Sequence, residues 1–321
     1  MSDRLAGLRQ WRPTPTAVRR AFLGALVANT SIVVTGGAVR LTASGLGCPT
    51  VPKCTDTSLI PTAEMGAHGA IEFANRMLTF ALAAAVAAAL VTAWRAGRRE
   101  LVRAAALLIV GIIAQAGLGA VTVKTGLNPV TVMAHFLLSM ALIAIAVRAY
   151  EIASAAPEQV MPVVSRELRL GAGALLVVVA LTLFAGTVVT GTGPHSGDKD
   201  STDRLPFALA TVTHLHADLV FILVGLSIGL LIAIAATGGP GFLVRHAVVL
   251  LGVVLAQGTI GYAQYATDLP VVLVGLHILG ACLVWIAALR VAFGLNPRLT
   301  GRGAAVRTGA AGRSRRRRKA A

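Results

Sequence analysis

Charged residues are scarce in this chain: they make up 13% of its 321 residues, whereas about 25% is typical of a soluble domain. Acidic residues are the rarer kind, with 13 Asp and Glu against 29 Lys and Arg. Hydrophobic residues, by contrast, reach 56%. This composition is too apolar for an ordinary soluble protein, so the sequence predicts a membrane protein.

Long apolar runs divide the chain. A helix that spans a bilayer needs about 20 mostly apolar residues. Runs of this kind cover approximately 21–39, 69–93, 104–123, 130–150, 170–190, 207–236, 246–265 and 271–294. They leave little chain for a soluble domain. The prediction is an all-α polytopic membrane protein with eight transmembrane helices.

Basic residues are unevenly distributed between the segments that separate these runs. If successive runs alternate in direction, the N-terminal segment, the loops 95–103 and 148–169 and the tail RSRRRRKAA share one side and carry most of them. The opposite loops hold Arg40, Lys53, Lys124, Lys199 and Arg204. The positive-inside rule then predicts a multi-pass protein of the cell membrane with both termini cytoplasmic. We interpret the tail as a topology signal that contacts anionic lipid, and we expect no nucleic-acid partner.

Cysteine is rare, with only three residues, and two of them are close together. Cys48 and Cys54 lie in GLGCPTVPKCTD, on the outer loop between the first two runs. The outside is oxidising, which makes a disulfide across this short loop plausible, and two free thiols are the alternative. Cys282 lies in the last run, where we expect it to pack.

The chain contains an internal duplication. AQAGLGAVTVKTGLNPVTVMAHF starts at Ala114 and AQGTIGYAQYATDLPVVLVGLHI starts at Ala256. The same offset aligns Gln115 with Gln257 and His135 with His277 without a gap. We therefore predict two pseudo-symmetric four-helix bundles. The predicted divisions are an N-terminal half at 1–150, a cytoplasmic linker at 151–169, a C-terminal half at 170–294 and a basic tail at 295–321.

Polar residues recur at a similar shallow depth in every second run. Aligning IEFANRMLTFAL with VTHLHADLVFIL places Asn75 opposite His216 in the repeat, and His135 and His277 already match. His214 is two residues from His216, about 200° around a helix, so both cannot face the bundle interior. The alignment selects His216. Ionisable groups inside a membrane usually face the bundle interior and mark a functional site.

Two histidines on facing helices suit heme better than zinc. A zinc site needs more Cys, His or carboxylate ligands nearby, whereas a heme iron needs one or two axial ligands and an apolar slot. His216 and His277 therefore predict a bis-histidine heme in the C-terminal half. The N-terminal half has His135 but Asn75 where its twin has histidine, so an iron held there would keep an open or weakly ligated position.

Four further residues surround that open half. Glu72 is a candidate proton donor or acceptor, and a structural pair with Arg76 is the alternative. His68 shares the face of Glu72 and has three possible roles: a partner of Glu72, the missing iron ligand, or a residue of the membrane interface. Arg76 and Arg40 are candidates to contact heme propionates.

These motifs together resemble the heme A synthase family. The matching segments are GGAVRLTASGLGCPTVPKC at 36–54, EFANR at 72–76, MAHF at 133–136, GTVVTGTGPHSGD at 186–198, HLHADLVF at 214–221 and GLHI at 275–278. The resemblance implies an oxidoreductase that converts heme O to heme A for terminal oxidases, by oxidising a methyl group to a formyl group through successive hydroxylations. It also implies heme O synthase and an electron donor as partners.

The resemblance assigns roles to individual residues. It implies a cofactor heme b between His216 and His277, and a substrate heme in the N-terminal half with Glu72 as the catalytic residue and His135 as the iron ligand. Many members read Glu-x-x-His-Arg where this chain has Glu72-Phe-Ala-Asn75-Arg76, so the second N-terminal histidine is absent. The alternative functions are a membrane heme carrier or exporter and a diheme b-type electron-transfer subunit.

Overall fold

The computed structural model describes residues 11–155, 164–201 and 203–296. Eight of its helices are long and apolar enough to cross a membrane, which confirms the predicted polytopic all-α fold. They are α2 (Pro15–Leu41), α3 (Gly66–Arg95), α4 (Arg99–Lys124), α5 (Pro129–Ser154), α6 (Arg166–Thr192), α7 (Leu209–Ala236), α8 (Gly241–Ala266) and α9 (Val271–Leu295), and a 3-10 turn, η1 (Ala63–Met65), precedes α3. The predicted linker and tail lie partly outside the described residues.

Side-chain caps explain where several helices begin. Thr14 accepts a 3.2 Å hydrogen bond from the Ala17 amide, and Asn128 accepts one of 3.0 Å from the Val130 amide. Each of these caps precedes a proline, Pro15 or Pro129, whose fixed φ suits the first helical position. The helices extend beyond the apolar runs of the sequence because their terminal turns are polar. For example, α4 begins at Arg99 and ends at Lys124.

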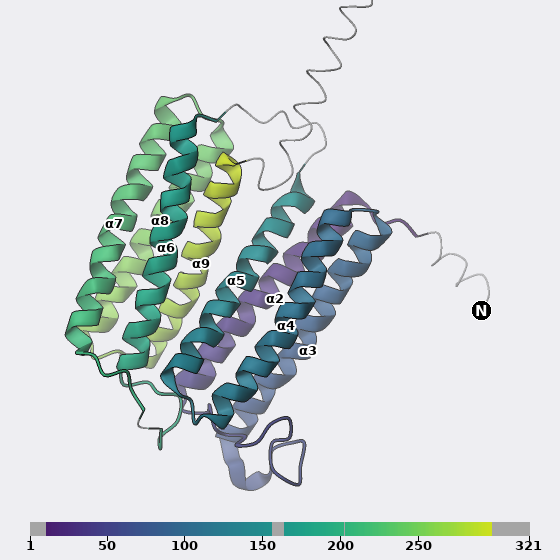
Figure 1. Cartoon of the computed structure of the whole chain (residues 1–321), viewed down its shortest axis with the longest axis vertical. Coiled ribbons are helices and arrows are strands. Elements are labelled where there is room, and N and C mark those ends of the chain that lie inside the picture. Colours follow the sequence, from purple (N-terminus) through teal and green to yellow (C-terminus); the bar gives the residue numbers. More distant parts are fainter. Residues whose placement is uncertain (1–10, 156–163, 202, 297–321) are drawn as a thin grey trace, which may run out of the picture.

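The eight helices form two closed rings (Figure 1). In the first ring, α2 contacts α3, α3 contacts α4, α4 contacts α5, and α5 returns to α2. In the second ring, α6 to α9 repeat this order. The rings meet through contacts between α5 and α9, between α2 and α9, and between α5 and α6. If α2 to α5 correspond to α6 to α9 in order, the α2–α9 contact is the counterpart of the α5–α6 contact. The structure therefore has the predicted pseudo-symmetry.

The seam between the two rings combines close packing with polar ties. A Cβ added to Gly37 on α2 would lie 2.7 Å from Cδ1 of Ile278 on α9, so the two helices approach too closely for a larger residue. The Trp285 indole donates a 2.8 Å hydrogen bond from α9 to the Met140 carbonyl on α5. Close approach through small residues and interhelical hydrogen bonds are the forces that associate helices in lipid.

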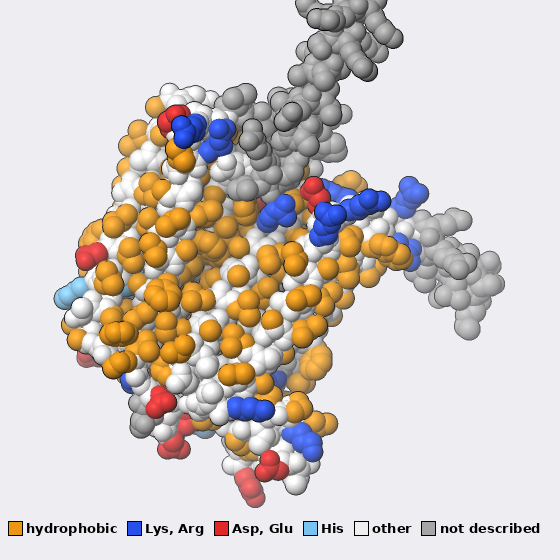
Figure 2. Space-filling view, viewed as in Figure 1, with side chains coloured by type: hydrophobic (Ala, Val, Ile, Leu, Met, Phe, Trp, Pro, Cys, Tyr) orange, Lys and Arg blue, Asp and Glu red, His pale blue; other side chains and the backbone are white. Residues whose placement is uncertain are grey.

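The outer surface of the rings is apolar. Figure 2 shows hydrophobic side chains covering the middle of one face, with charged side chains gathered toward its two ends. Large apolar residues are strongly exposed, including Val272 at 72%, Phe80 at 69% and Ile113 at 67%. Such exposure would be a liability in water, whereas lipid tails solvate these side chains.

The turns that follow α4 and α8 have the same backbone geometry. Leu127 and Leu269, which match in the repeat, both lie in the left-handed region, with φ of 62° and 58°. The Leu127 amide donates to the Thr122 carbonyl at 2.9 Å, and the Leu269 amide donates to the Gln264 carbonyl at 2.8 Å. A short outer turn of this kind places α5 and α9 in the same way relative to α4 and α8.

Candidate functional site

His216 on α7 and His277 on α9 face each other inside the C-terminal ring. Their ring centroids are 6.4 Å apart and their planes meet at 70°. A metal–nitrogen bond is about 2 Å and a ring centroid lies roughly 1 Å behind the nitrogen, so two imidazoles sharing one metal ion place their centroids about 6 Å apart. The observed spacing fits one ion between them. His214, two residues away, is exposed, as the repeat alignment predicts.

A second contact orients His216. Its Nδ1 lies 3.1 Å from the Thr182 carbonyl oxygen on α6, and only a protonated Nδ1 can donate to that oxygen. This tautomer leaves Nε2 as the nitrogen with a free lone pair. A hydrogen bond from the other ring nitrogen is the usual way in which proteins orient a metal-binding histidine.

Glycines make room for all three site histidines. A Cβ added to Gly119 would lie 3.3 Å from Cε1 of His135, and the corresponding distance is 3.2 Å both from Gly186 to His216 and from Gly261 to His277. In each case the glycine belongs to the helix preceding the histidine. The fourth equivalent pair is Gly36 and Asn75, at 3.9 Å to Asn75 Nδ2. The tight glycine–histidine contact therefore occurs three times among the described residues, and a looser glycine contact occurs at Asn75.

Matched glutamines hold the helices that carry two of these histidines. Gln115 Nε2 donates to the His135 carbonyl at 3.0 Å, and Gln257 Nε2 donates to the His277 carbonyl at 2.8 Å. These bonds join α4 to α5 at the level of His135, and α8 to α9 at the level of His277. The polar match that revealed the duplication in the sequence thus has a structural cause. The imidazole Nδ1 atoms of His135 and His277 are buried and have no partner among the described residues.

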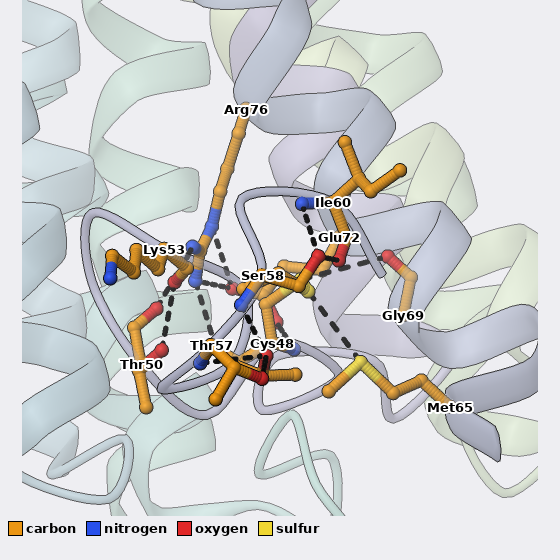
Figure 3. The surroundings of a disulfide bond; sticks show 12 residues. Cys48, Thr50, Lys53, Thr57, Ser58, Ile60, Met65, Gly69, Glu72 and Arg76 are labelled. Atoms are coloured by element: carbon orange, nitrogen blue, oxygen red, sulfur yellow. Dashed lines mark hydrogen bonds and ion pairs between the residues drawn. A yellow bond between two sulfur atoms is a disulfide. The ribbon is translucent and has the colours of Figure 1, made fainter. Parts of the chain in front are cut away.

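Glu72 is buried near the N-terminal end of α3, with 6% of its surface exposed. Its Oε2 accepts a 2.6 Å hydrogen bond from the Cys48 amide, and its Oε1 accepts one of 3.1 Å from Arg76 Nε (Figure 3). The pair with Arg76, one turn along the helix, is therefore present. Both carboxylate oxygens have partners, so the structure places a fixed carboxylate against the outer loop.

Arg76 also holds the outer loop in place. Its Nη2 donates to the Cys48 carbonyl at 2.9 Å, and its Nη1 donates to the Thr50 carbonyl at 3.0 Å and the Lys53 carbonyl at 3.3 Å (Figure 3). Cys48 and Cys54 form the predicted disulfide within this loop, with their Cα atoms 4.4 Å apart. These loop contacts of Arg76 do not follow from the sequence pattern, because loop carbonyls leave no signal in it.

His68 and Ser44 form another contact between the loop and α3. The His68 Nδ1 lies 3.0 Å from the Ser44 hydroxyl, and His68 lines a cavity of about 330 Å³ at the outer end of the molecule. Asp198 and Lys199 line the same cavity. The contact with Ser44 leaves the three roles considered for His68 as predictions.

Arg40 connects the two halves. Its Nε donates to the His195 carbonyl at 2.6 Å and its Nη2 donates to the Thr190 carbonyl at 2.9 Å. Arg40 also lines a cavity of about 250 Å³, together with Lys199 and Arg204. The contacts to the second half were not foreseen from the sequence.

These observations define a class: a polytopic membrane protein with an internal four-helix repeat and a facing histidine pair. Comparison with protein families matches residues 19–195 to COX15-CtaA, described as "Cytochrome oxidase assembly protein". The chain belongs to this family, the heme A synthase family identified from the sequence motifs. The match covers α2 to α6 and their loops, and it ends before His216 and His277. No curated protein matches the chain.

Proposed function

We propose that the protein is a heme A synthase of the cell membrane, with both termini cytoplasmic. It oxidises the methyl group of heme O to a formyl group through successive hydroxylations, and the product heme A serves terminal oxidase assembly. The observation that carries this proposal is the asymmetry of the repeat. The C-terminal half has two facing histidines, and the N-terminal half has His135 with Asn75 at the equivalent of the second.

The C-terminal residues fit a cofactor heme b. The spacing of His216 and His277 suits one metal ion, and the glycines beside both rings leave the space that a porphyrin-bound imidazole needs. Across the described residues, no group of three or more His, Cys, Asp and Glu side chains could hold a metal ion, so the pair acts alone as a ligand set. A heme held in this way would transfer electrons one at a time.

The N-terminal residues fit the substrate heme O. His135 has a buried Nδ1 without a partner among the described residues, and Gly119 leaves space beside its ring. His135 would bind the substrate iron from one side. Glu72 would hold or move a proton at Oε1 or Oε2, and its hydrogen bonds to Cys48 and Arg76 keep that carboxylate in one orientation.

Two alternatives from the sequence remain as outcomes of the test. A diheme electron-transfer subunit would need two closed sites, and Asn75 offers no imidazole for the second one. A heme carrier would need no fixed buried carboxylate beside its open half, whereas Glu72 is held by two partners. Heme O synthase and an electron donor are the partners that the proposed reaction requires.

The experiment is to express the full chain with and without heme O synthase, in cells that lack their own heme A activity, and to extract the pigments. Heme A is expected only when heme O and the chain are both present. Heme O accumulating unchanged beside a folded, heme-loaded protein would reject the enzyme and favour the carrier. A purified protein with two low-spin hemes and no heme A would favour the electron-transfer subunit.

A further inference from the structure

Asn75 occupies the one position among four equivalents that lacks an imidazole. Each of the other three, His135, His216 and His277, lies tightly against a glycine of the preceding helix, and Asn75 lies next to Gly36 of its preceding helix at an ordinary contact distance of 3.9 Å. In the C-terminal half the two members of the pair face each other across the ring. The repeat therefore places Asn75 across the N-terminal ring from His135, on the side of the iron that His135 does not bind.

A hydrogen bond from Thr35 fixes which end of the Asn75 amide faces that side. The Thr35 hydroxyl lies 2.7 Å from Asn75 Oδ1, the usual distance for an O–H···O bond and shorter than the usual N–H···O bond. Its distances to the Ser31 and Ile32 carbonyls, 3.1 and 3.2 Å, are longer, so the single hydroxyl proton goes to Asn75. The oxygen of the amide is thereby occupied.

The nitrogen of the same amide keeps both of its protons available. Nδ2 is the Asn75 atom nearest to Gly36, and no described residue accepts a hydrogen bond from it. An amide nitrogen has no lone pair to offer a metal, so it cannot replace the missing imidazole. It can only donate. A donor on the open side of a heme is one of the features by which proteins control what binds to the iron.

We propose that Asn75, oriented by Thr35, is a hydrogen-bond donor to a small ligand bound at the open axial position of the substrate iron, opposite His135. This inference rests on the proposed function, since it requires a heme in the N-terminal half. It assigns Asn75 a role in stabilising the bound ligand, and Thr35 a role in positioning Asn75. The neighbouring Glu72 carboxylate is an acceptor and is turned toward Cys48 and Arg76.

Fluoride binding to the ferric protein tests this proposal, because fluoride occupies an open heme position and accepts hydrogen bonds strongly. The full chain is purified with heme O, and fluoride is titrated while the high-spin absorbance and electron paramagnetic resonance signals are recorded. The C-terminal bis-histidine heme has no open position, and its low-spin signal reports folding in every variant. Asn75→Leu, which keeps the branched shape at Cγ and removes the donor, should lower the fluoride association constant about tenfold.

Three further variants complete the test. Thr35→Val should also weaken fluoride binding, although by less, because the amide can still turn toward the ligand. Thr30→Val is the matched control, since the Thr30 hydroxyl bonds only to Leu26 of its own helix. Asn75→His should convert the high-spin signal to low-spin and abolish fluoride binding, because it rebuilds the arrangement of the other half.

The outcomes separate the inference from the proposed function. An Asn75→Leu protein that keeps its high-spin heme and its full fluoride affinity overturns the donor role and leaves the heme site intact. An Asn75→His protein that stays high-spin shows that position 75 does not face the iron, which also overturns it. If the wild-type protein contains no heme to which fluoride binds, the proposed N-terminal site is overturned, and the inference with it.

Discussion

Arg40 on α2 donates a 2.6 Å hydrogen bond from its Nε to the carbonyl oxygen of His195, in the loop after α6. Arg40 lies in the last turn of α2, which ends at Leu41, and His195 follows the end of α6 at Thr192. His195 in turn places its Nε2 3.0 Å from the Leu269 carbonyl before α9. The C-terminal ends of α2 and α6 and the N-terminal end of α9 are thus joined in one chain of contacts across the seam.

Arg40→Ala should weaken the seam without changing either ring. Two hydrogen bonds from a charged donor are lost, and we expect a loss of stability of about 1 to 3 kcal/mol. Thermal unfolding in detergent, followed by size exclusion, measures it. Arg19→Ala is the control, because Arg19 is an exposed residue of the same helix. Equal melting temperatures for the two variants would contradict a bridging role for Arg40.

His216→Ala and His277→Ala should each abolish the low-spin b-type heme spectrum, because either substitution removes one of the two proposed axial ligands. His214→Ala should leave that spectrum unchanged, since His214 is exposed and lies two residues from the site on the same helix. Absorption spectra of the reduced and oxidised purified proteins give the answer. The assignment fails if the spectrum survives both single substitutions.

Gly261→Ala should disturb the cofactor heme. The added Cβ would lie 3.2 Å from Cε1 of His277, so the imidazole must shift by a few tenths of an ångström. Changes around a metal ligand typically cost 10- to 100-fold in affinity, and we expect heme retention after dialysis to fall on the order of tenfold. Gly258→Ala on the same helix meets nothing within 4 Å. It should retain heme and gain slightly in stability, because alanine favours helix. Equal heme retention by both variants would exclude the steric role of Gly261.

Glu72→Gln and Glu72→Ala should separate proton transfer from loop anchoring. Gln can still accept the Cys48 amide proton, so the loop should keep its protection from hydrogen exchange, whereas Ala should expose the Cys48 amide. Both variants should lose heme A formation if the carboxylate moves a proton. Arg76→Ala should free the loop as well, because it removes the hydrogen bonds to Cys48, Thr50 and Lys53. Full heme A output from Glu72→Gln would show that the role of Glu72 is structural alone.

The fold was predictable from the sequence because its causes are periodic and local. Long apolar runs specify the spans, and the matched Gln and His residues specify the repeat, since each pair makes the same bond in its own half. The Cys48–Cys54 disulfide was predictable because a short outer loop brings its two cysteines together. Helical geometry showed that His214 and His216 cannot both face the bundle interior, and the repeat alignment selected His216.

The contacts of Arg40 and Arg76 were not predictable from the sequence. Arg40 and Arg76 donate largely to backbone carbonyls. Because a carbonyl is present at every residue, no pattern of side chains in the sequence indicates which one an arginine will bind. The propionate contacts expected of both residues stay predictions. The Thr35–Asn75 hydrogen bond joins α2 to α3. It was not predictable because an alignment of the two halves shows Asn75 only as a mismatch with His216.

The α2–α9 contact and the α5–α6 contact are counterparts of each other in the repeat, and this has a consequence for the origin of the molecule. An interface that maps onto itself under a two-fold rotation is the interface of a homodimer. A single four-helix unit bearing these faces would pair with its own copy through them, and each copy would carry the same ligand. Joining the copies in one polypeptide frees the two halves to diverge, as they do where Asn75 replaces the equivalent of His216.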